Sequence, residues 1–312
     1  MEKETSKMSA TRKVLLVVRT GDRSFHPDWL SGSGAQYRNW DLHISYFGDK
    51  PSSEVTRNAD VSITREKGPK YPGLVECLGK IEARLPHYDY VGFPDDDLYA
   101  RCATWNTFTN IILKHRPALA QPALDRRSFS VFPQLFQDPR YLLRWTNFVE
   151  TMTPVFSRDA LPIARQYFLE NKSGWGMDLL WPHLFGAEDR KVCVVDAAPV
   201  LHTRRGRTGP LYKDLAKSGA PDPMDDLRNF RKKYNVDIPV YRTYGGVMRS
   251  GIATDKVETE PCMDSVLRWR ERLRIRWDIT ELNPHRRWAE TIPLLLSREV
   301  ERQRTGPRKK GT

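Results

Sequence analysis

The sequence predicts an α/β fold in which a mixed sheet is flanked by helices. Short apolar runs rich in branched and aromatic side chains, such as residues 14–18 and 88–93, have the composition of buried strands. Segments of helical periodicity lie between such runs; in residues 74–85 the apolar side chains fall on one helical face. Strand, loop, helix and strand follow one another at lengths typical of α/β crossovers.

The other elements follow from the same two patterns, taken along the chain. Further strands are expected at residues 40–47, 61–64, 119–123, 148–156 and 192–195. Further helices are expected at residues 105–115, around 163–168, from 178 to 184 and at 227–234. Residues 126–144 are expected to be irregular.

Composition and charge indicate a folded protein with an anionic partner. Hydrophobic residues make up 39% of the 312 residues, and the formal net charge is +12. Nucleic acid, acidic lipid headgroups and nucleotide diphosphates all fit this charge. The four cysteines are scattered without the spacing of a zinc site, which indicates reduced thiols and a cytoplasmic location. The run at residues 14–18 is too short for a signal sequence or a membrane span.

Three regions are expected: a disordered polar leader at residues 1–11, a main domain at 12–235, and a basic, mainly helical extension at 236–312. In the extension, Val266, Trp269, Leu273 and Trp277 fall on one helical face with arginines between them. Such a stripe either packs onto its own domain or lies peripherally on an anionic membrane. No nucleic-acid-binding module accompanies it, so nucleic acid is not the expected partner.

The stretch with the strongest chemical signal is Asp95-Asp96-Asp97, which follows directly after the apolar run at residues 88–93 and Pro94. The acids therefore stand at the carboxyl end of a predicted strand, where ligands bind in open α/β sheets. Adjacent carboxylates repel one another unless a cation is present. Mg²⁺ or Mn²⁺ carrying a phosphate would satisfy them. The alternative is that Asp97 or its neighbour caps the helix starting near Cys102.

Two basic residues are candidates for a diphosphate. Arg19 follows the first strand, and Lys70 precedes Tyr71-Pro72-Gly73. A solvated turn explains Arg19 equally well. Neither a Gly-x-Gly-x-x-Gly sequence nor a phosphate-loop lysine motif is present, so neither a dinucleotide fold nor a phosphate-loop NTPase is supported.

A second candidate stretch is Gly174-Trp175-Gly176, followed by Asp178. Two glycines allow close approach of a ligand to the backbone, and the indole offers a flat face for a sugar ring. Asp178 is also explained as a carboxylate in the first turn of a helix. His202 follows the last predicted strand and could supply an imidazole to a metal, although a lone histidine is more often a packed or surface residue.

Taken together, these features resemble the glycosyltransferases of the A-type (GT-A) fold, which use a nucleotide-diphosphate sugar and a divalent metal. Asp95–Asp97 is similar to their Asp-x-Asp motif, residues 174–178 to their acceptor-side Gly-Trp-Gly and acid, and His202 to their late metal-binding histidine. An uncharacterised family of bacterial and plant proteins with this pattern is more similar still, through residues 121–124, 152–158, 174–178 and 194–196. The resemblance covers roughly residues 13–212.

The resemblance implies a GT-A-like, Rossmann-type mixed sheet and a division of roles. Asp95, Asp97 and His202 would bind Mn²⁺ or Mg²⁺. Asp96, Arg19 and Lys70 would bind the nucleotide-sugar donor. Gly174, Trp175 and Gly176 would contact the sugar and the acceptor.

It also implies the reaction. Asp178 would act as general base if the anomeric centre is inverted, and would only orient the sugar if the configuration is retained. Asp178 is followed by Leu179-Leu180 and not by the further acids of some inverting relatives. The acceptor would be a hydroxyl of a glycan or glycoconjugate, in cell-surface polysaccharide synthesis, and the loop at residues 205–219 could close over the diphosphate. The alternative function is a non-enzymatic basic protein on the same scaffold that binds nucleic acid or anionic lipid.

Overall fold

The computed structural model describes residues 12–51, 55, 59–60, 62–130, 132–170, 172–204 and 222–255. All of them belong to the first of two units into which the chain divides, Met1–Pro261. The expected leader at residues 1–11, the basic loop at 205–219 and the Trp/Arg stripe at 266–277 lie outside the described residues.

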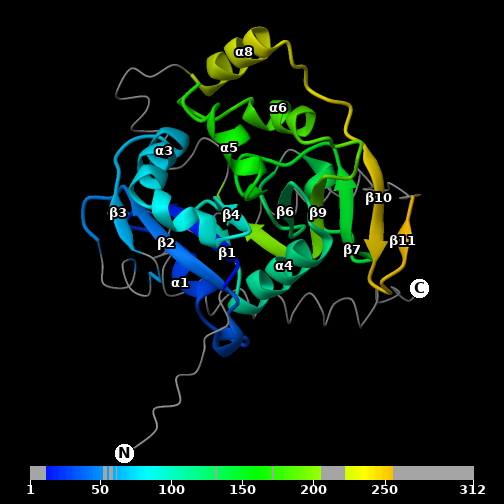
Figure 1. The fold of residues 1–312 in the computed structure, drawn as a ribbon, viewed down its shortest axis with the longest axis horizontal. Coiled ribbons are helices and arrows are strands. Elements are labelled where there is room, and N and C mark those ends of the chain that lie inside the picture. The colour runs from blue at the N-terminus through cyan, green and yellow to red at the C-terminus, as the bar shows by residue number, and fades with distance from the viewer. Residues whose placement is uncertain are drawn as a thin grey trace, which may run out of the picture. The chain divides into compact units, whose positions relative to one another are not determined.

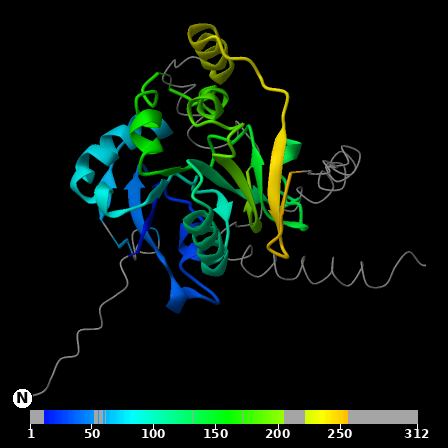
Figure 2. The ribbon, with the colours of Figure 1, turned by 45° about the vertical axis from the view of Figure 1, so that its right-hand side comes forward.

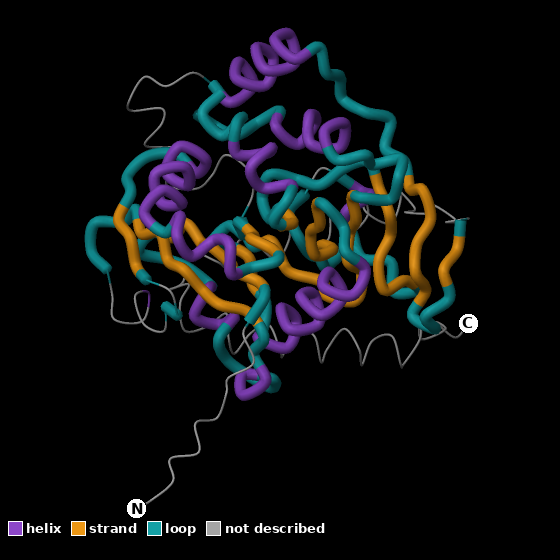
Figure 3. Tube along the Cα trace, in the orientation of Figure 1, coloured by secondary structure: helices purple, strands orange, loops and turns teal. Residues whose placement is uncertain are grey.

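One eleven-stranded mixed sheet organises the described part of the chain. Its strands are β1 (Val14–Thr20), β2 (Trp40–Tyr46), β3 (Ile63–Arg65), β4 (Tyr90–Gly92), β5 (Leu98–Tyr99), β6 (Leu119–Leu124), β7 (Tyr141–Thr146), β8 (Val155–Ser157), β9 (Val192–His202), β10 (Thr243–Met248) and β11 (Ala253–Thr254). The order is β11-β10-β7-β9-β6-β8-β4-β1-β2-β3, and β5 pairs with β9. In Figure 3 the strands follow one another in orange from β3 on the left to β11 on the right.

Helices flank this sheet. They are α1 (His26–Trp29), α3 (Lys70–Lys80), α4 (Cys102–His115), α5 (Ala160–Arg165), α6 (Met177–Leu184) and α8 (Pro223–Tyr234), with 3-10 turns at Ala35–Tyr37, Glu82–His87 and Pro133–Leu135. Helix α3 packs against β1, β2 and β3, and α4 packs against β2 and β9 (Figure 1). Helix α8 lies beside α6, as Figures 1 and 2 both show. The expected α/β class, a mixed sheet flanked by helices, is confirmed.

The strand directions create one edge where several carboxyl ends meet. β1 is parallel to β2 and β4, and β6 is parallel to β9. β8 lies between β4 and β6 and is antiparallel to both, so β4 and β6 run in the same direction. The segments that follow β1, β4 and β9 therefore leave the sheet at the same edge, which is the edge used for ligands in open α/β sheets.

An aromatic cluster forms the core beside that edge. Every residue of β1 is buried. The Tyr71 and Phe168 rings lie 4.9 Å apart between centroids, and the Phe156 and Trp181 rings 5.1 Å. Burying each such side chain contributes about 1.5–3 kcal/mol. Because Tyr71 comes from the start of α3 and Trp181 from α6, the cluster fixes both helices relative to the sheet.

Two expectations about strands were wrong. The strand expected at residues 148–156 is a turn up to Pro154, and only Val155–Ser157 pairs with the sheet. The region expected to be irregular contains β7, which pairs with β9 and β10. β7 carries Arg144, whose charge makes the segment look exposed, but Asp196 neutralises that charge inside the protein.

The main sheet extends beyond the boundary placed at residue 235, while residues 256–312 of the expected helical extension lie outside the described residues, so its helices remain a prediction. β10 and β11 continue the main sheet to Thr254, and no helix occurs among the described residues after Tyr234. Two glycines in β10 lower its strand propensity, so the sequence pattern did not predict this strand. A Cβ at Gly246 would lie 2.8 Å from the Leu143 carbonyl oxygen, so close pairing with β7 requires a residue without a side chain. Within the described part of the chain, no helix is long and apolar enough to cross a membrane.

Candidate functional site

Pairing between β5 and β9 brings the three aspartates and His202 together. Leu98 lies opposite His202 in this short antiparallel ladder. Beyond it, the Asp97 carbonyl oxygen accepts hydrogen bonds from the Thr203 backbone N–H (3.1 Å) and hydroxyl (2.8 Å). On the other side, the Asp95 N–H donates to the Met152 carbonyl oxygen (2.9 Å). The backbone therefore fixes where the carboxylates stand.

Asp97 and His202 form an ion pair through one of the two carboxylate oxygens of Asp97. His202 Nε2 lies 3.6 Å from Asp97 Oδ2. His202 Nδ1 donates to the Phe129 carbonyl oxygen (2.6 Å), so Nε2 is the nitrogen that faces the acid. Asp97 Oδ1 is buried and has no hydrogen-bond partner among the described residues. A buried carboxylate oxygen is expected to have a partner.

The charges of this pair reinforce each other. Burial lowers the pKa of His202, but the Asp97 carboxylate more than compensates and raises it to about 9. Burial raises the pKa of Asp97, yet the charges of His202, Arg204 and Lys70 together hold it below its ordinary value. The acid is therefore ionised and available to a cation.

Asp96 connects the acids to the loop after β1. Its side chain accepts a hydrogen bond from the Gly21 backbone N–H (3.1 Å), and Arg204 lies 3.4 Å away. Burial raises the pKa of Asp96 to about 7, although Arg204 counteracts it. Asp96 thus holds this loop in place, and its donor-binding role remains a prediction.

Lys70 lies in the site, beside Asp95. Its Nζ is 2.6 Å from Asp95 Oδ1 and donates to the carbonyl oxygens of Thr151 (2.8 Å) and Met152 (3.0 Å). Burial raises the pKa of Asp95, and Lys70 offsets part of this increase. The ammonium group of Lys70 therefore forms an ion pair with Asp95, a carboxylate that was predicted to bind metal.

Arg19 is held by hydrogen bonds within the protein, and its donor-binding role remains a prediction. The residue is 5% exposed, and its guanidinium donates to Ser45 Oγ (3.0 Å) and to the carbonyl oxygens of Glu66 (3.1 Å) and Gly68 (2.7 Å). Two of these acceptors lie in the segment after β3. The residues next to Arg19 in the sequence do not indicate that it would bind there.

Asp178 stands in the first turn of α6, as the structural alternative expects. It is buried and accepts hydrogen bonds from the backbone N–H groups of Gly176, Leu179 and Thr151. Burial raises its pKa to about 7, which these hydrogen bonds only partly counteract. Its carboxylate thus ties α6 to the turn at residue 151, and its role as general base remains a prediction.

The glycines before Asp178 serve internal packing. Gly174 and Gly176 have φ of +80° and +101°. A Cβ at Gly174 would lie 2.5 Å from the Tyr71 ring, and one at Gly176 would lie 3.1 Å from Phe230. Trp175 between them is half-buried. The protein's own rings therefore lie where a Cβ at either glycine would point, and sugar contact by Gly174, Trp175 and Gly176 remains a prediction.

We expect Gly174→Ala to destabilise the fold more than Gly251→Ala. Gly251 has a similar φ of +86°, but no atom lies within 4 Å of the place that an alanine methyl group would take, so alanine there costs only about 1–2 kcal/mol of backbone strain. The clash with Tyr71 should add about 1–3 kcal/mol at Gly174. Urea unfolding of both variants measures the difference, and equal losses would contradict tight packing at this turn.

Sequence reasoning missed three residues of the site: Glu150, Tyr71 and Arg204. Glu150 is a single acid in the apolar run at residues 148–152, and that isolation is the signal that could have revealed it. The Tyr71 hydroxyl donates to the Thr151 carbonyl oxygen (2.9 Å), next to the two hydrogen bonds of Lys70. The turn that begins at Glu150 therefore connects α3, α6 and the aspartates.

The residues fit a divalent cation in part. The unpartnered Asp97 Oδ1 and the orientation of His202 suit a metal ligand pair. Asp95 fits only if Lys70 releases it. In the part of the chain that the structure describes, no group of three or more His, Cys, Asp or Glu side chains is already arranged to hold a metal ion.

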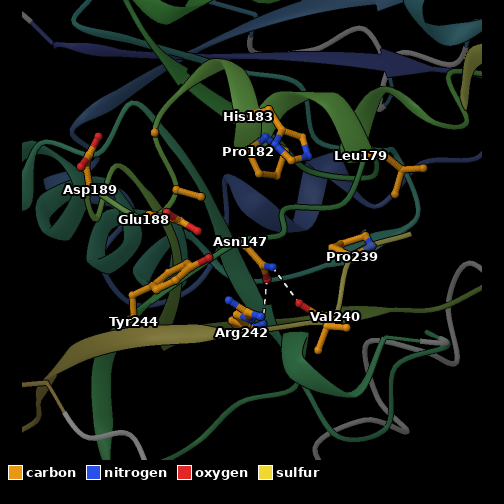
Figure 4. A pocket seen from close by; sticks show the side chains of 12 residues that line it. Asn147, Leu179, Pro182, His183, Glu188, Asp189, Pro239, Val240, Arg242 and Tyr244 are labelled. Atoms are coloured by element: carbon orange, nitrogen blue, oxygen red, sulfur yellow. Dashed lines mark hydrogen bonds between the residues drawn. The ribbon is translucent and has the colours of Figure 1, made fainter. Parts of the chain in front are cut away.

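A cavity of about 500 Å³ opens between α6 and the segment that leads into β10. Its lining combines apolar residues with the polar side chains of His183, Glu188, Arg242 and Tyr244 (Figure 4). Asn147 fixes the outer wall, because its side chain donates to the Val240 carbonyl oxygen (2.9 Å) and accepts from the Arg242 N–H (2.8 Å). The aspartates do not line this cavity, but Leu179, the neighbour of Asp178, does.

Comparisons with known proteins found a family model that matches part of the chain, and solved structures with similar folds. A family model described as a protein of unknown function (DUF707) matches residues 133–244. This stretch contains Glu150, Asp178 and His202 but not the three aspartates. A comparison with curated proteins gave no match.

Similar solved structures include GalNAc-T7 with UDP, GalNAc and Mn²⁺, at 10% identity and a TM-score of 0.46, covering 72% of this chain and 55% of that one. Another is S. aureus TarS 1–349 in complex with UDP-GlcNAc, at 12% identity and a TM-score of 0.46, covering 73% and 68%. They are nucleotide-sugar glycosyltransferases. This is the class that the sequence resembles, but this chain spans little more than half of GalNAc-T7. Similarity at this level establishes no activity.

Proposed function

We propose that this protein is a metal-dependent glycosyltransferase that moves a sugar from a nucleotide-diphosphate donor to a hydroxyl of a glycan or glycoconjugate. The observation that carries the proposal is the Asp97–His202 pair with its buried, unpartnered oxygen, at the carboxyl edge of a mixed sheet and next to Lys70. An anionic ligand together with a cation would satisfy the carboxylate and the ammonium group at once.

The residues divide the work as follows. Asp97, His202 and, once released by Lys70, Asp95 would hold Mn²⁺ or Mg²⁺, which when bound neutralises charge on a leaving diphosphate. Lys70 would turn from Asp95 to the diphosphate oxygens, because both are anionic partners of one ammonium group. Asp96 and Arg204 would keep the loop after β1 against the donor.

The acceptor belongs on the α6 side of the site in this proposal. Trp175 would contact the sugar, and the cavity beside Leu179 would receive the rest of the acceptor, because its size and its mixture of polar and apolar lining suit a sugar, which has hydroxyl groups and apolar faces. A role in cell-surface polysaccharide synthesis, in the cytoplasm and with peripheral contact to an anionic membrane, is the setting that we propose from the sequence.

One observation favours a second function. Lys70, Arg204 and His202 each face one of the three aspartates, so the acids have cationic partners without any metal. That arrangement also suits a non-enzymatic protein with this scaffold, which would bind nucleic acid or anionic lipid through its net charge of +12.

Thermal unfolding separates the two functions. Wild-type protein is heated with UDP, GDP and their sugars, in Mn²⁺ and in chelator. A ligand at one hundred times its Kd should add about 2.7 kcal/mol of stability, which amounts to several degrees. We expect this shift only with metal, and we expect it to disappear in Asp97→Ala. Asp49→Ala is the control, since its side chain is 85% exposed at the end of a neighbouring strand. Stabilisation by single-stranded DNA or anionic vesicles that is unaffected by Asp97→Ala would refute the proposed enzymatic function.

A further inference from the structure

The turn that begins at Glu150 is held in place from several directions. The Glu150 backbone N–H donates to Oε1 of Gln121 (2.7 Å), a fully buried side chain of β6. The carbonyl oxygen of the next residue, Thr151, accepts from Lys70 and Tyr71, and its N–H donates to Asp178. Glu150 therefore has little freedom to move its backbone away from the site.

The Glu150 side chain has a free oxygen inside the site. Oε2 is buried and has no hydrogen-bond partner among the described residues. The charged groups that act on the carboxylate are His202, Asp178, Asp95 and Lys70, which are the members of the candidate active site. The pKa of Glu150 is raised to about 7, mainly by burial; His202 and Lys70 oppose the increase, and Asp178 and Asp95 add to it. A buried acceptor without a donor in the protein is positioned to accept from a ligand.

Asp178 differs in this respect. Its carboxylate accepts several backbone N–H hydrogen bonds at the start of α6 and from Thr151. These backbone donors hold the carboxylate at the start of α6, and moving it toward a substrate hydroxyl would separate α6 from the turn. Of the two acids, Glu150 has the oxygen that is available.

We propose that Glu150, not Asp178, accepts the proton of the acceptor hydroxyl, and that Asp178 positions the turn carrying Glu150. This inference rests on the proposed function. As the acceptor oxygen forms its bond to the anomeric carbon, its O–H bond breaks and the proton goes to Glu150 Oε2. The bond from the anomeric carbon to the diphosphate breaks, and its electron pair leaves with the diphosphate. From the sequence, Asp178 was assigned this role because it follows Gly174-Trp175-Gly176, as the corresponding acid does in GT-A glycosyltransferases.

Donor turnover in conservative variants tests the assignment. UDP release from UDP-GlcNAc, UDP-glucose and UDP-galactose is measured with Mn²⁺, with water or added oligosaccharide as acceptor. We expect Glu150→Gln to lower kcat by about 10²–10⁴-fold, while stabilisation by UDP and Mn²⁺ stays at the wild-type value. Asp178→Asn should lower the melting temperature and reduce kcat less than Glu150→Gln does. Glu76→Gln, on the exposed side of α3, is the control.

A second variant keeps the test independent of folding. In Glu150→Ala, added formate should restore part of the lost turnover, because a small carboxylate can take the proton in place of the side chain. Wild-type kcat in Glu150→Gln, a larger loss in Asp178→Asn, or failure of formate rescue would each overturn the assignment. Wild-type protein that is neither stabilised by UDP with Mn²⁺ nor active would instead overturn the proposed function, and the inference with it.

Discussion

Arg144→Ala is expected to lower the free energy of unfolding by about 3–5 kcal/mol. Asp196 is fully buried, and Arg144 binds both of its oxygens, with Nε 2.8 Å from Oδ2 and Nη2 2.8 Å from Oδ1. Arg144 also donates to the Phe136 carbonyl oxygen (2.8 Å). Burial already raises the pKa of Asp196 despite the guanidinium. Without Arg144, the carboxylate would be left in the protein interior with a backbone N–H from Asp138 as its remaining partner.

Urea unfolding measures this loss, and two variants show its origin. Arg140→Ala breaks a pair with Asp138 that is partly exposed, so it should cost at most about 1 kcal/mol. The double variant Arg144→Met/Asp196→Leu removes both charges and should recover most of the stability. Equal losses in Arg144→Ala and Arg140→Ala would show that the buried pair does not hold β7 against β9.

Local sequence patterns were sufficient to predict the strands and helices whose own residues have a clear apolar pattern. β1, β2 and β6 are apolar runs, and α4 and α6 have a continuous apolar face, so each lies close to where the sequence predicts it. β7 escaped prediction because the partner that neutralises Arg144 is 52 residues away. β10 escaped it because its glycines are required by a neighbouring strand and contribute no strand propensity.

The same difference between local patterns and distant partners explains which residues of the site could be predicted. Asp97 and His202 could be brought together by reasoning alone, because residues that follow parallel strands of one sheet meet at one edge. Lys70, which was predicted to bind the donor, lies beside Asp95, and its donor-binding role remains a prediction. Glu150 could not be placed, since its position depends on Gln121 from β6 and on hydrogen bonds from α3. The hydrogen bonds of Arg19 could not be predicted for a similar reason, because its partners after β3 are far away in the sequence.

Lys70→Met is expected to change the affinities for metal and for nucleotide in opposite directions. Lys70 Nζ is 2.6 Å from Asp95 Oδ1, so the ammonium group and a divalent cation compete for one carboxylate. A hydrogen bond to a charged group contributes about 1.5–3 kcal/mol. Removing the competitor should therefore tighten binding of Mn²⁺ alone by about 10–100-fold. Binding of UDP at saturating Mn²⁺ should weaken by a similar factor, because the diphosphate loses its cationic partner.

Isothermal titration calorimetry with Mn²⁺ alone, and then with UDP, measures both affinities. Lys80→Met is the matched control on α3, since Lys80 pairs with Glu66 and Glu76 and not with the aspartates. It should leave both affinities unchanged. If Lys70→Met weakens Mn²⁺ and UDP together, Lys70 orients Asp95 for the metal and does not compete with it. If neither affinity changes, Lys70 only holds the carbonyl oxygens of Thr151 and Met152, and the exchange of its ammonium group between Asp95 and the diphosphate is refuted.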